Sequence, residues 1–211
     1  MSANPFPPLR GLYAISNGPR TDLLDACAAA LAGGATILQY RDKTDAHARR
    51  LDEARALQAL CARHRVPLIV NDDVDLAAAS GAAGVHLGEG DAPICEARAR
   101  LGRDAIIGVS CYDSLERARQ FAAAGADYLA FGAFFPSPTK PHARVATPQL
   151  LSQAKTLGLP VVAIGGITHA NAPLLIDAGA DAVAVISALF DASDVHAAAR
   201  RFAALFETLP S

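Results

Sequence analysis

Residues 127–140 read DYLAFGAFFPSPTK, and in this stretch a short apolar run leads directly into a stiff polar loop. The run YLAF is apolar and rich in aromatic residues, which predicts a buried strand. Gly132 ends the run, and the two prolines that follow fix φ and stiffen the loop. Ser137, Thr139 and Lys140 add hydroxyls and an ammonium, which together suit an anion. An ordinary proline-rich surface turn is the alternative reading of this stretch alone.

The same unit, a short apolar strand followed by an alanine-rich helix, recurs along the chain. Eight strands are expected, over residues 11–16, 35–40, 66–70, 84–87, 105–109, 127–131, 160–164 and 181–186. Helices are expected over residues 21–32, 45–64, 74–80, 93–101, 114–124, 147–157, 171–178 and 194–207. Glycines recur between the end of a helix and the start of the next strand, at residues 33–34, 81, 125 and 179. Glycine at this place can adopt the left-handed conformation that caps a helix, so the recurrence indicates a repeated unit.

Strands that are apolar at nearly every position are typical of a parallel sheet buried on both faces. Eight β/α units in 211 residues predict an α/β protein, a single-domain (β/α)8 TIM barrel. A doubly wound open sheet is the alternative. Residues 1–10 are expected to form a proline-rich lead-in, and residues 11–211 the catalytic barrel.

Composition narrows the class of partner. The formal net charge is −2 and no basic run occurs, so nucleic acid is not an expected partner. No window of about 18 apolar residues is free of charge, so no membrane span is expected. The four cysteines form no C-x-x-C pair and the N-terminus has no signal-peptide core. Reduced thiols in a cytoplasmic protein are therefore expected.

In a barrel of this kind the chemistry gathers at the carboxyl ends of the strands. Polar residues collect after those ends, whereas the opposite ends carry mainly Gly, Ala, Pro and Val. In chain order the collected residues are Gln39, Arg41, Lys43, Asn71, Asp72, Asp73, Glu89, Asp91, Ser110, Ser137, Thr139, Lys140, Gly165, Gly166 and Ser187. This asymmetry is the strongest functional signal in the sequence.

Gln39, Arg41 and Lys43 alternate along an extended segment, so their side chains should point to one side. Two cations directed at the barrel mouth need an anionic partner, and a polyphosphate would supply it. Because Asp42 intervenes, a solvated loop of mixed charge is the alternative.

Carboxylates follow two neighbouring strands. Asp72 and Asp91 are expected to bind Mg²⁺, which takes oxygen ligands and shares them with substrate phosphates. Glu89, two residues before Asp91, is a candidate third carboxylate at the same ion. Asp73 opens a helix, which favours an N-cap. His86 lies inside a strand, which favours a hydrogen-bonded core residue over a metal ligand.

The last two strands end in IGGI (164–167) and AVIS (184–187). Glycines at these two loops let backbone N–H groups approach a phosphate, although tight turns need glycine as well. Two anion sites are therefore expected, which would fit two anionic substrates or one bisphosphate.

Seven motifs carry a family resemblance: QYRDK (39–43), NDD (71–73), GVHLG (84–88), GVS (108–110), FFPSPTK (134–140), AIGGI (163–167) and VIS (185–187). In order and spacing they resemble the thiamine-phosphate synthase family over nearly the whole chain. The resemblance implies a (β/α)8 barrel that joins hydroxymethylpyrimidine diphosphate to thiazole phosphate and releases pyrophosphate, with Mg²⁺ as cofactor.

The resemblance also implies roles for individual residues. Arg41, Lys140 and Ser110 are the expected catalytic residues, with Ser110 near the reacting centre. Gln39 is expected to bind the pyrimidine, and the diphosphate is expected to contact Arg41, Lys43, Asn71 and Lys140. Mg²⁺ is expected to bind to Asp72 and Asp91. The thiazole phosphate is expected to contact Ser137, Thr139, Gly166, Ile186 and Ser187.

Three positions depart from the family pattern. Glu89 precedes Gly90 where the family usually has Gln and an acidic residue, Ala133 replaces a frequent Pro, and Ser137 replaces Thr. Two other functions on the same scaffold are a thiazole tautomerase paralogue and a non-catalytic phosphate-binding regulator. The combination of a diphosphate clamp with paired metal carboxylates favours the synthase, because the tautomerase handles a single phosphate.

Overall fold

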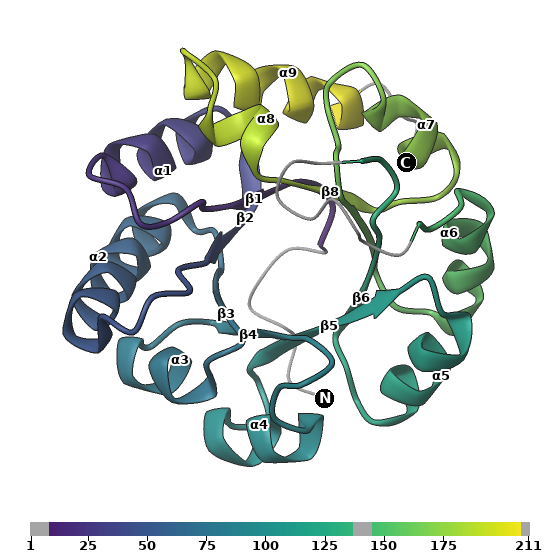
Figure 1. The fold of residues 1–211 in the computed structure, drawn as a ribbon, viewed down its shortest axis with the longest axis horizontal. Helices are drawn as coiled ribbons and strands as arrows, with labels where there is room; N and C mark the ends of the chain where they lie inside the picture. The colour runs from purple at the N-terminus through teal and green to yellow at the C-terminus, as the bar shows by residue number, and fades with distance from the viewer. Residues whose placement is uncertain (1–8, 137–144, 208–211) are drawn as a thin grey trace.

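The computed structural model describes residues 9–136 and 145–207, which fold into a closed barrel of eight parallel strands surrounded by helices (Figure 1). Each strand pairs with the next one in the sequence, and β8 closes the barrel on β1. The predicted (β/α)8 barrel is therefore confirmed, and the open-sheet alternative is wrong. No helix within the two described ranges is both long and apolar enough to cross a bilayer.

The strands are β1 (Gly11–Ile15), β2 (Ala35–Tyr40), β3 (Leu68–Asn71), β4 (Gly84–Leu87), β5 (Ile106–Tyr112), β6 (Tyr128–Phe131), β7 (Val161–Ile164) and β8 (Ala182–Val185). The helices are α1 (Leu23–Ala32), α2 (His47–His64), α3 (Val74–Ser80), α4 (Ile94–Leu101), α5 (Leu115–Ala123), α6 (Gln149–Ala154), the 3-10 turn η1 (Lys155–Leu157), α7 (Ala172–Asp177), α8 (Ser187–Phe190) and α9 (Val195–Glu207).

Most of these bounds lie within two residues of the expected ones, and three differences are informative. Strand β5 continues to Tyr112, and its register against β6 shifts between Ser110 and Tyr112, as at a β-bulge. The helix expected over residues 147–157 is α6 followed by a 3-10 turn. Helix α8 was not expected, because its four residues are too few to establish a helical period.

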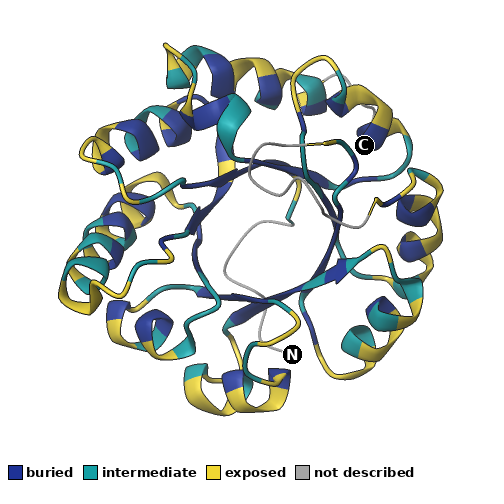
Figure 2. Cartoon of the chain, in the orientation of Figure 1, coloured by how far each residue is buried: buried dark blue, intermediate teal, exposed yellow. Residues whose placement is uncertain are grey.

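The strands are buried on both faces, which their sequences predicted (Figure 2). Along β1, Leu12 and Ala14 belong to the layer packed between the strands and the helices. Tyr13 and Ile15 alternate with them and belong to a second cluster inside the barrel. The interior is therefore a packed core, and a ligand must enter from one of its two ends.

The glycines between a helix and the next strand have the expected left-handed backbone conformation. Gly34, Gly81, Gly125 and Gly179 have φ values of 102°, 71°, 89° and 108°, in the region that favours glycine. In two of these segments the glycine is followed by Ala and Asp, and the aspartate has a role that the sequence did not reveal. Asp127 accepts a hydrogen bond from the Ile107 N–H at 2.7 Å, which ties the start of β6 to β5.

Candidate active site

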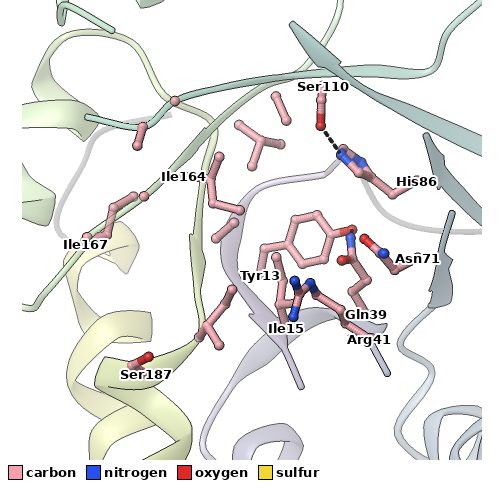
Figure 3. Close-up of a pocket in the computed structure, with 18 of the residues that line it drawn as sticks. Tyr13, Ile15, Gln39, Arg41, Asn71, His86, Ser110, Ile164, Ile167 and Ser187 are labelled. Atoms are coloured by element: carbon pink, nitrogen blue, oxygen red, sulfur yellow. Dashed lines mark hydrogen bonds between the residues drawn. The ribbon is translucent and has the colours of Figure 1, made fainter. Parts of the chain in front are cut away.

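A cavity of about 410 Å³ opens at the carboxyl ends of the strands, and every strand contributes to its wall (Figure 3). Seven of the residues to which the family resemblance gave a role line it together: Gln39, Arg41, Asn71, Ser110, Gly166, Ile186 and Ser187. They come from β2, β3 and β5, from the loops that follow β2 and β7, and from the start of α8. The barrel thus gathers residues that lie up to 148 positions apart, as 187 − 39 gives.

Lys43 lies beside this cavity and not in its wall. It lines an adjacent hollow of about 320 Å³, which Asp72 also lines and which shares Asn71 with the main cavity. The Lys43 ammonium lies 3.1 Å from the Asp72 carboxylate. The expected alternation is therefore only partly observed: Gln39 and Arg41 face the main cavity, and Lys43 faces the acidic residues next to it.

Asp72 and Asp91 form a pair of neighbouring carboxylates. Burial raises the pKa of Asp91, the Gly88 N–H at 2.5 Å partly offsets this, and the nearby Asp72 carboxylate raises the pKa further. Two partly buried like charges repel each other, and a cation bound between them relieves the repulsion. Two carboxylates with the remaining positions left to water and phosphate suit Mg²⁺. This donor set therefore fits the expected ion.

The backbone of Asp72 has an uncommon conformation. Its φ is 64°, in the left-handed region that residues other than glycine rarely adopt. Its N–H donates to the His86 carbonyl oxygen at 2.8 Å, which ties the end of β3 to β4. Such backbone conformations are held by the surrounding structure and cluster at functional sites.

Glu89 does not complete a three-carboxylate site. Within the described residues no group of three or more His, Cys, Asp or Glu side chains that could hold a metal ion is found, so the structure gives the third-carboxylate hypothesis no support. The Glu89 carboxylate lies 3.9 Å from the Arg117 guanidinium, and Glu89 lines the main cavity. Asp73 behaves as expected and caps α3, because its carboxylate accepts from the Leu76 N–H at 2.8 Å.

The loops after β6 and β7 pack closely against each other. Gly166 has a φ of 61°, and a Cβ atom at this position would lie 2.5 Å from the Pro136 carbonyl oxygen. The Phe135 N–H donates to the Gly165 carbonyl oxygen at 3.1 Å. Glycine is therefore required here by the neighbouring backbone, in addition to any ligand that approaches it.

Helix α8 begins at the cavity wall. Ile186 is its N-cap, and Ser187 and Ala188 are its first residues, all of which line the cavity. The first N–H groups of a helix have no partner within the helix and carry partial positive charge. A short extra helix after the eighth strand is a recurrent phosphate-binding element in barrels of this class.

Three residues that the sequence did not assign to the site belong to it or touch it. Tyr13 and His86 line the cavity, and the Tyr128 ring contacts the rings of both in the barrel interior. The expectation that His86 is a hydrogen-bonded core residue is confirmed, since Nδ1 lies 2.9 Å from the Tyr128 Oη and Nε2 lies 2.9 Å from the Ser110 Oγ. These three residues could have been found from the sequence, because each is a polar side chain at an inward-facing position of an otherwise apolar strand.

Ser137, Thr139 and Lys140 lie outside the described residues, so their roles stay predictions. Pro136, the last described residue before them, lines the cavity.

Known proteins resemble the chain over almost its full length. The family model described as thiamine monophosphate synthase matches residues 12–189. A thiamine-phosphate synthase from Chromobacterium violaceum is 55% identical over 202 residues, which are 95% of this chain and 98% of the relative. Another from Methylobacillus flagellatus is 55% identical over 209 residues, which are 98% of this chain and 100% of the relative.

Solved structures agree with these matches. A thiamine phosphate pyrophosphorylase from Pyrococcus furiosus superimposes with a TM-score of 0.85 at 36% identity, covering 97% of this chain and 96% of that one. The Bacteroides thetaiotaomicron protein of the same name has a TM-score of 0.70 at 15% identity over 95% of this chain and all of its own, which supports the fold alone. By the family model and by relatives at more than half identity, the chain belongs to the thiamine-phosphate synthase family.

Proposed function

We propose that the chain is a transferase that joins 4-amino-2-methyl-5-hydroxymethylpyrimidine diphosphate to hydroxyethylthiazole phosphate, giving thiamine phosphate and pyrophosphate. The observation that supports the proposal is that the barrel mouth presents two separate sets of groups, each of which suits an anion. Arg41, Lys43 and the acidic pair lie on one side, and the Gly166 loop with the start of α8 lies on another. Two phosphorylated substrates need such a division.

The diphosphate would bind where the cations gather. Arg41 lines the cavity, and within the described residues no carboxylate pairs with its guanidinium. Its charge is therefore available to an anionic ligand, together with Lys43, Asn71 and the predicted Lys140. Asp72 and Asp91 would hold Mg²⁺, which when bound would neutralise negative charge that develops on the departing diphosphate.

The pyrimidine would lie deeper in the cavity, against Gln39 and Ser110. Both side chains reach the cavity from strand positions, which holds them more firmly than loop positions would. The thiazole phosphate would bind at Gly166, Ile186 and Ser187, with Ser137 and Thr139 as predicted additional contacts.

The reaction would proceed by loss of the leaving group. The bond between the pyrimidine methylene carbon and the diphosphate oxygen breaks, and its electron pair leaves with the diphosphate. The electron-rich aminopyrimidine ring stabilises the resulting carbocation, and the thiazole nitrogen then donates its lone pair to form the new carbon–nitrogen bond. Arg41 and Lys140 would stabilise the developing negative charge, so no protein nucleophile is needed.

The apolar part of the cavity supports such an intermediate. Ile15, Val162 and Ile164 line the wall; the first two are buried and Ile164 is half-buried. A wall of this kind keeps water away from a carbocation that water would otherwise capture.

The test is to mix the purified protein with both substrates and Mg²⁺ and to measure pyrophosphate and thiamine phosphate. Equal amounts of the two products, with neither formed when the thiazole phosphate is omitted, are expected. Consumption of a thiazole phosphate isomer without pyrophosphate would favour the tautomerase, and binding without turnover would favour the regulator.

A further inference from the structure

A chain of hydrogen bonds crosses the barrel interior and connects two walls of the cavity, and Figure 3 shows its last contact, between His86 and Ser110. The Gln39 Nε2 donates to the Tyr13 Oη at 2.7 Å. The Tyr13 Oη lies 2.8 Å from the Tyr128 Oη, which lies 2.9 Å from Nδ1 of His86. The His86 Nε2 lies 2.9 Å from the Ser110 Oγ. Four interactions thus connect five strands, with Gln39 at one end and Ser110 at the other.

The middle of this chain is inaccessible to water. Tyr128 is 0% exposed and Tyr13 is 1% exposed. Buried polar groups must find partners within the protein, because leaving one unpaired forfeits its hydration without compensation. Each hydroxyl in the chain has one proton to donate, so the direction in which one group donates determines the direction at the next.

With the Gln39 amide oriented so that its Nε2 donates to Tyr13, one direction satisfies every member. Because Gln39 donates to Tyr13, the Tyr13 proton must go to Tyr128; otherwise it would face only the amide N–H within the described residues. In this direction Tyr128 donates to Nδ1 of His86, and the Nε2–H of His86 donates to Ser110. The Ser110 hydroxyl proton is left to point toward the cavity, as is the Gln39 carbonyl oxygen.

The opposite direction requires every member to change together. If the Gln39 amide turned by half a rotation, Tyr13 would donate to its oxygen, and the protons of Tyr128, His86 and Ser110 would all reverse. The two ends would then exchange roles, with the amide N–H at the cavity as donor and Ser110 as acceptor. The donor and acceptor faces of Gln39 and Ser110 are therefore coupled through the barrel core.

We propose that Tyr13, Tyr128 and His86 are positioning residues that hold the Gln39 carbonyl oxygen and the Ser110 hydroxyl proton toward the cavity as one acceptor and one donor. The inference rests on the proposed function, because an aminopyrimidine offers the complementary edge: its exocyclic amino group donates and the neighbouring ring nitrogen accepts. Groups whose orientation is fixed before the ligand arrives need no reorganisation when it binds.

Tyr128→Phe tests this arrangement, because it removes the central hydroxyl and keeps the ring. The matched control is Tyr40→Phe. Tyr40 is equally buried on a barrel strand, but its hydroxyl donates to Glu53 of α2 at 2.6 Å, on the helix side of the sheet. Tyr128→Phe should raise both the KM and the calorimetric Kd for the pyrimidine diphosphate about tenfold and change the KM for thiazole phosphate less than about twofold. Tyr40→Phe should leave all three within about twofold.

A double variant separates this coupling from a general loss of packing. Once Tyr128→Phe has interrupted the chain of hydrogen bonds, adding Tyr13→Phe should raise the Kd for the pyrimidine diphosphate little further. If the two substitutions acted through independent packing effects, their fold-changes in Kd would multiply. If circular dichroism shows that Tyr128→Phe does not fold, Tyr13→Phe with the same control carries the comparison.

Two results would overturn the inference: an unchanged Kd for the pyrimidine diphosphate in the Tyr128 variant, or multiplied effects in the double variant. The outcome is distinguishable from failure of the proposed function. A wild-type protein that forms no thiamine phosphate refutes that function, whereas an active wild type with unaffected tyrosine variants refutes only the positioning role.

Discussion

Asp181 and Val161 exchange two hydrogen bonds at the start of neighbouring strands. The Asp181 N–H donates to the Val161 carbonyl oxygen at 2.8 Å, and the Asp181 carboxylate accepts from the Val161 N–H at 2.8 Å. The second carboxylate oxygen lies 2.6 Å from the Lys155 ammonium. The aspartate side chain thus supplies the acceptor for the first N–H of β7. Asp127 and Ile107 repeat the arrangement between β6 and β5.

Replacing Asp181 by Ala should destabilise the barrel by about 1–3 kcal/mol, because the Val161 N–H loses a charged acceptor in a partly buried place. Urea denaturation of the purified variant measures this as a lower transition midpoint. Asp177→Ala is the control, since Asp177 is exposed at the end of α7 and should stay within about 0.5 kcal/mol of the wild type. Equal midpoints for the two variants would contradict the assigned role of Asp181.

Arg41→Gln should lower kcat/KM for the pyrimidine diphosphate at least about tenfold, equivalent to more than about 1.4 kcal/mol of transition-state stabilisation. The reason is the loss of a cavity cation that no carboxylate of the described residues neutralises. Steady-state pyrophosphate release provides the measurement. Arg63→Gln, on the exposed face of α2, controls for the loss of one positive charge and should leave the rate unchanged. A near wild-type rate for Arg41→Gln would remove this residue from the diphosphate site.

Asp91→Asn should weaken Mg²⁺ binding at least about tenfold, because one of two carboxylate ligands becomes neutral. Calorimetric titration in the presence of pyrophosphate reads the affinity directly, and the Mg²⁺ dependence of turnover reads it in the working enzyme. Glu89→Gln is the matched control, since the Glu89 carboxylate lies near Arg117 and outside any three-ligand group of the described residues. If both substitutions weakened Mg²⁺ equally, the assignment of Asp91 as a direct ligand would fail.

Ser187→Asp should raise the KM for thiazole phosphate at least about tenfold while leaving that for the pyrimidine diphosphate within about twofold. A carboxylate at the first residue of α8 is compatible with the helix, because negative charge is favourable at a helix N-terminus. It would nevertheless repel a phosphate at the same place. Ser187→Ala keeps the site neutral and isolates the effect of the charge. A larger effect on the pyrimidine substrate would reverse the proposed arrangement of the two substrates.

A thiol reagent at pH 8 should modify one of the four cysteines quickly in the folded protein. Burial raises the pKa of Cys27, Cys61 and Cys111 to about 12, so at pH 8 only about one part in ten thousand of each would be thiolate. Cys95 is exposed on α4 and remains accessible. Counting thiols with a chromogenic disulfide before and after denaturation measures this. Four fast thiols in the folded protein would contradict the packing of the core.

The sequence predicted the barrel because its signal is repeated: eight apolar strands and recurring glycines have a physical cause in each β/α unit. Residues at strand ends, such as Gln39 and Ser110, could be assigned to the cavity from topology alone. Two kinds of fact were not predictable. The direction of Lys43 depends on the loop after β2, and the Tyr13–Tyr128 contact depends on side chains that meet across the barrel from strands 115 residues apart. No local pattern encodes either.

Gly108 and Tyr128 restrict which residues can occupy each other's positions in the barrel interior. It is the register partner of Tyr128 on the neighbouring strand, and a Cβ atom on Gly108 would lie 1.8 Å from the Tyr128 ring. The ring occupies the volume that a side chain on β5 would need. A change at Gly108 alone forces the ring out of place, and a smaller residue at Tyr128 alone leaves a void. A side chain at Gly108 should therefore be tolerated only together with a smaller residue at Tyr128, so we expect the two positions to covary.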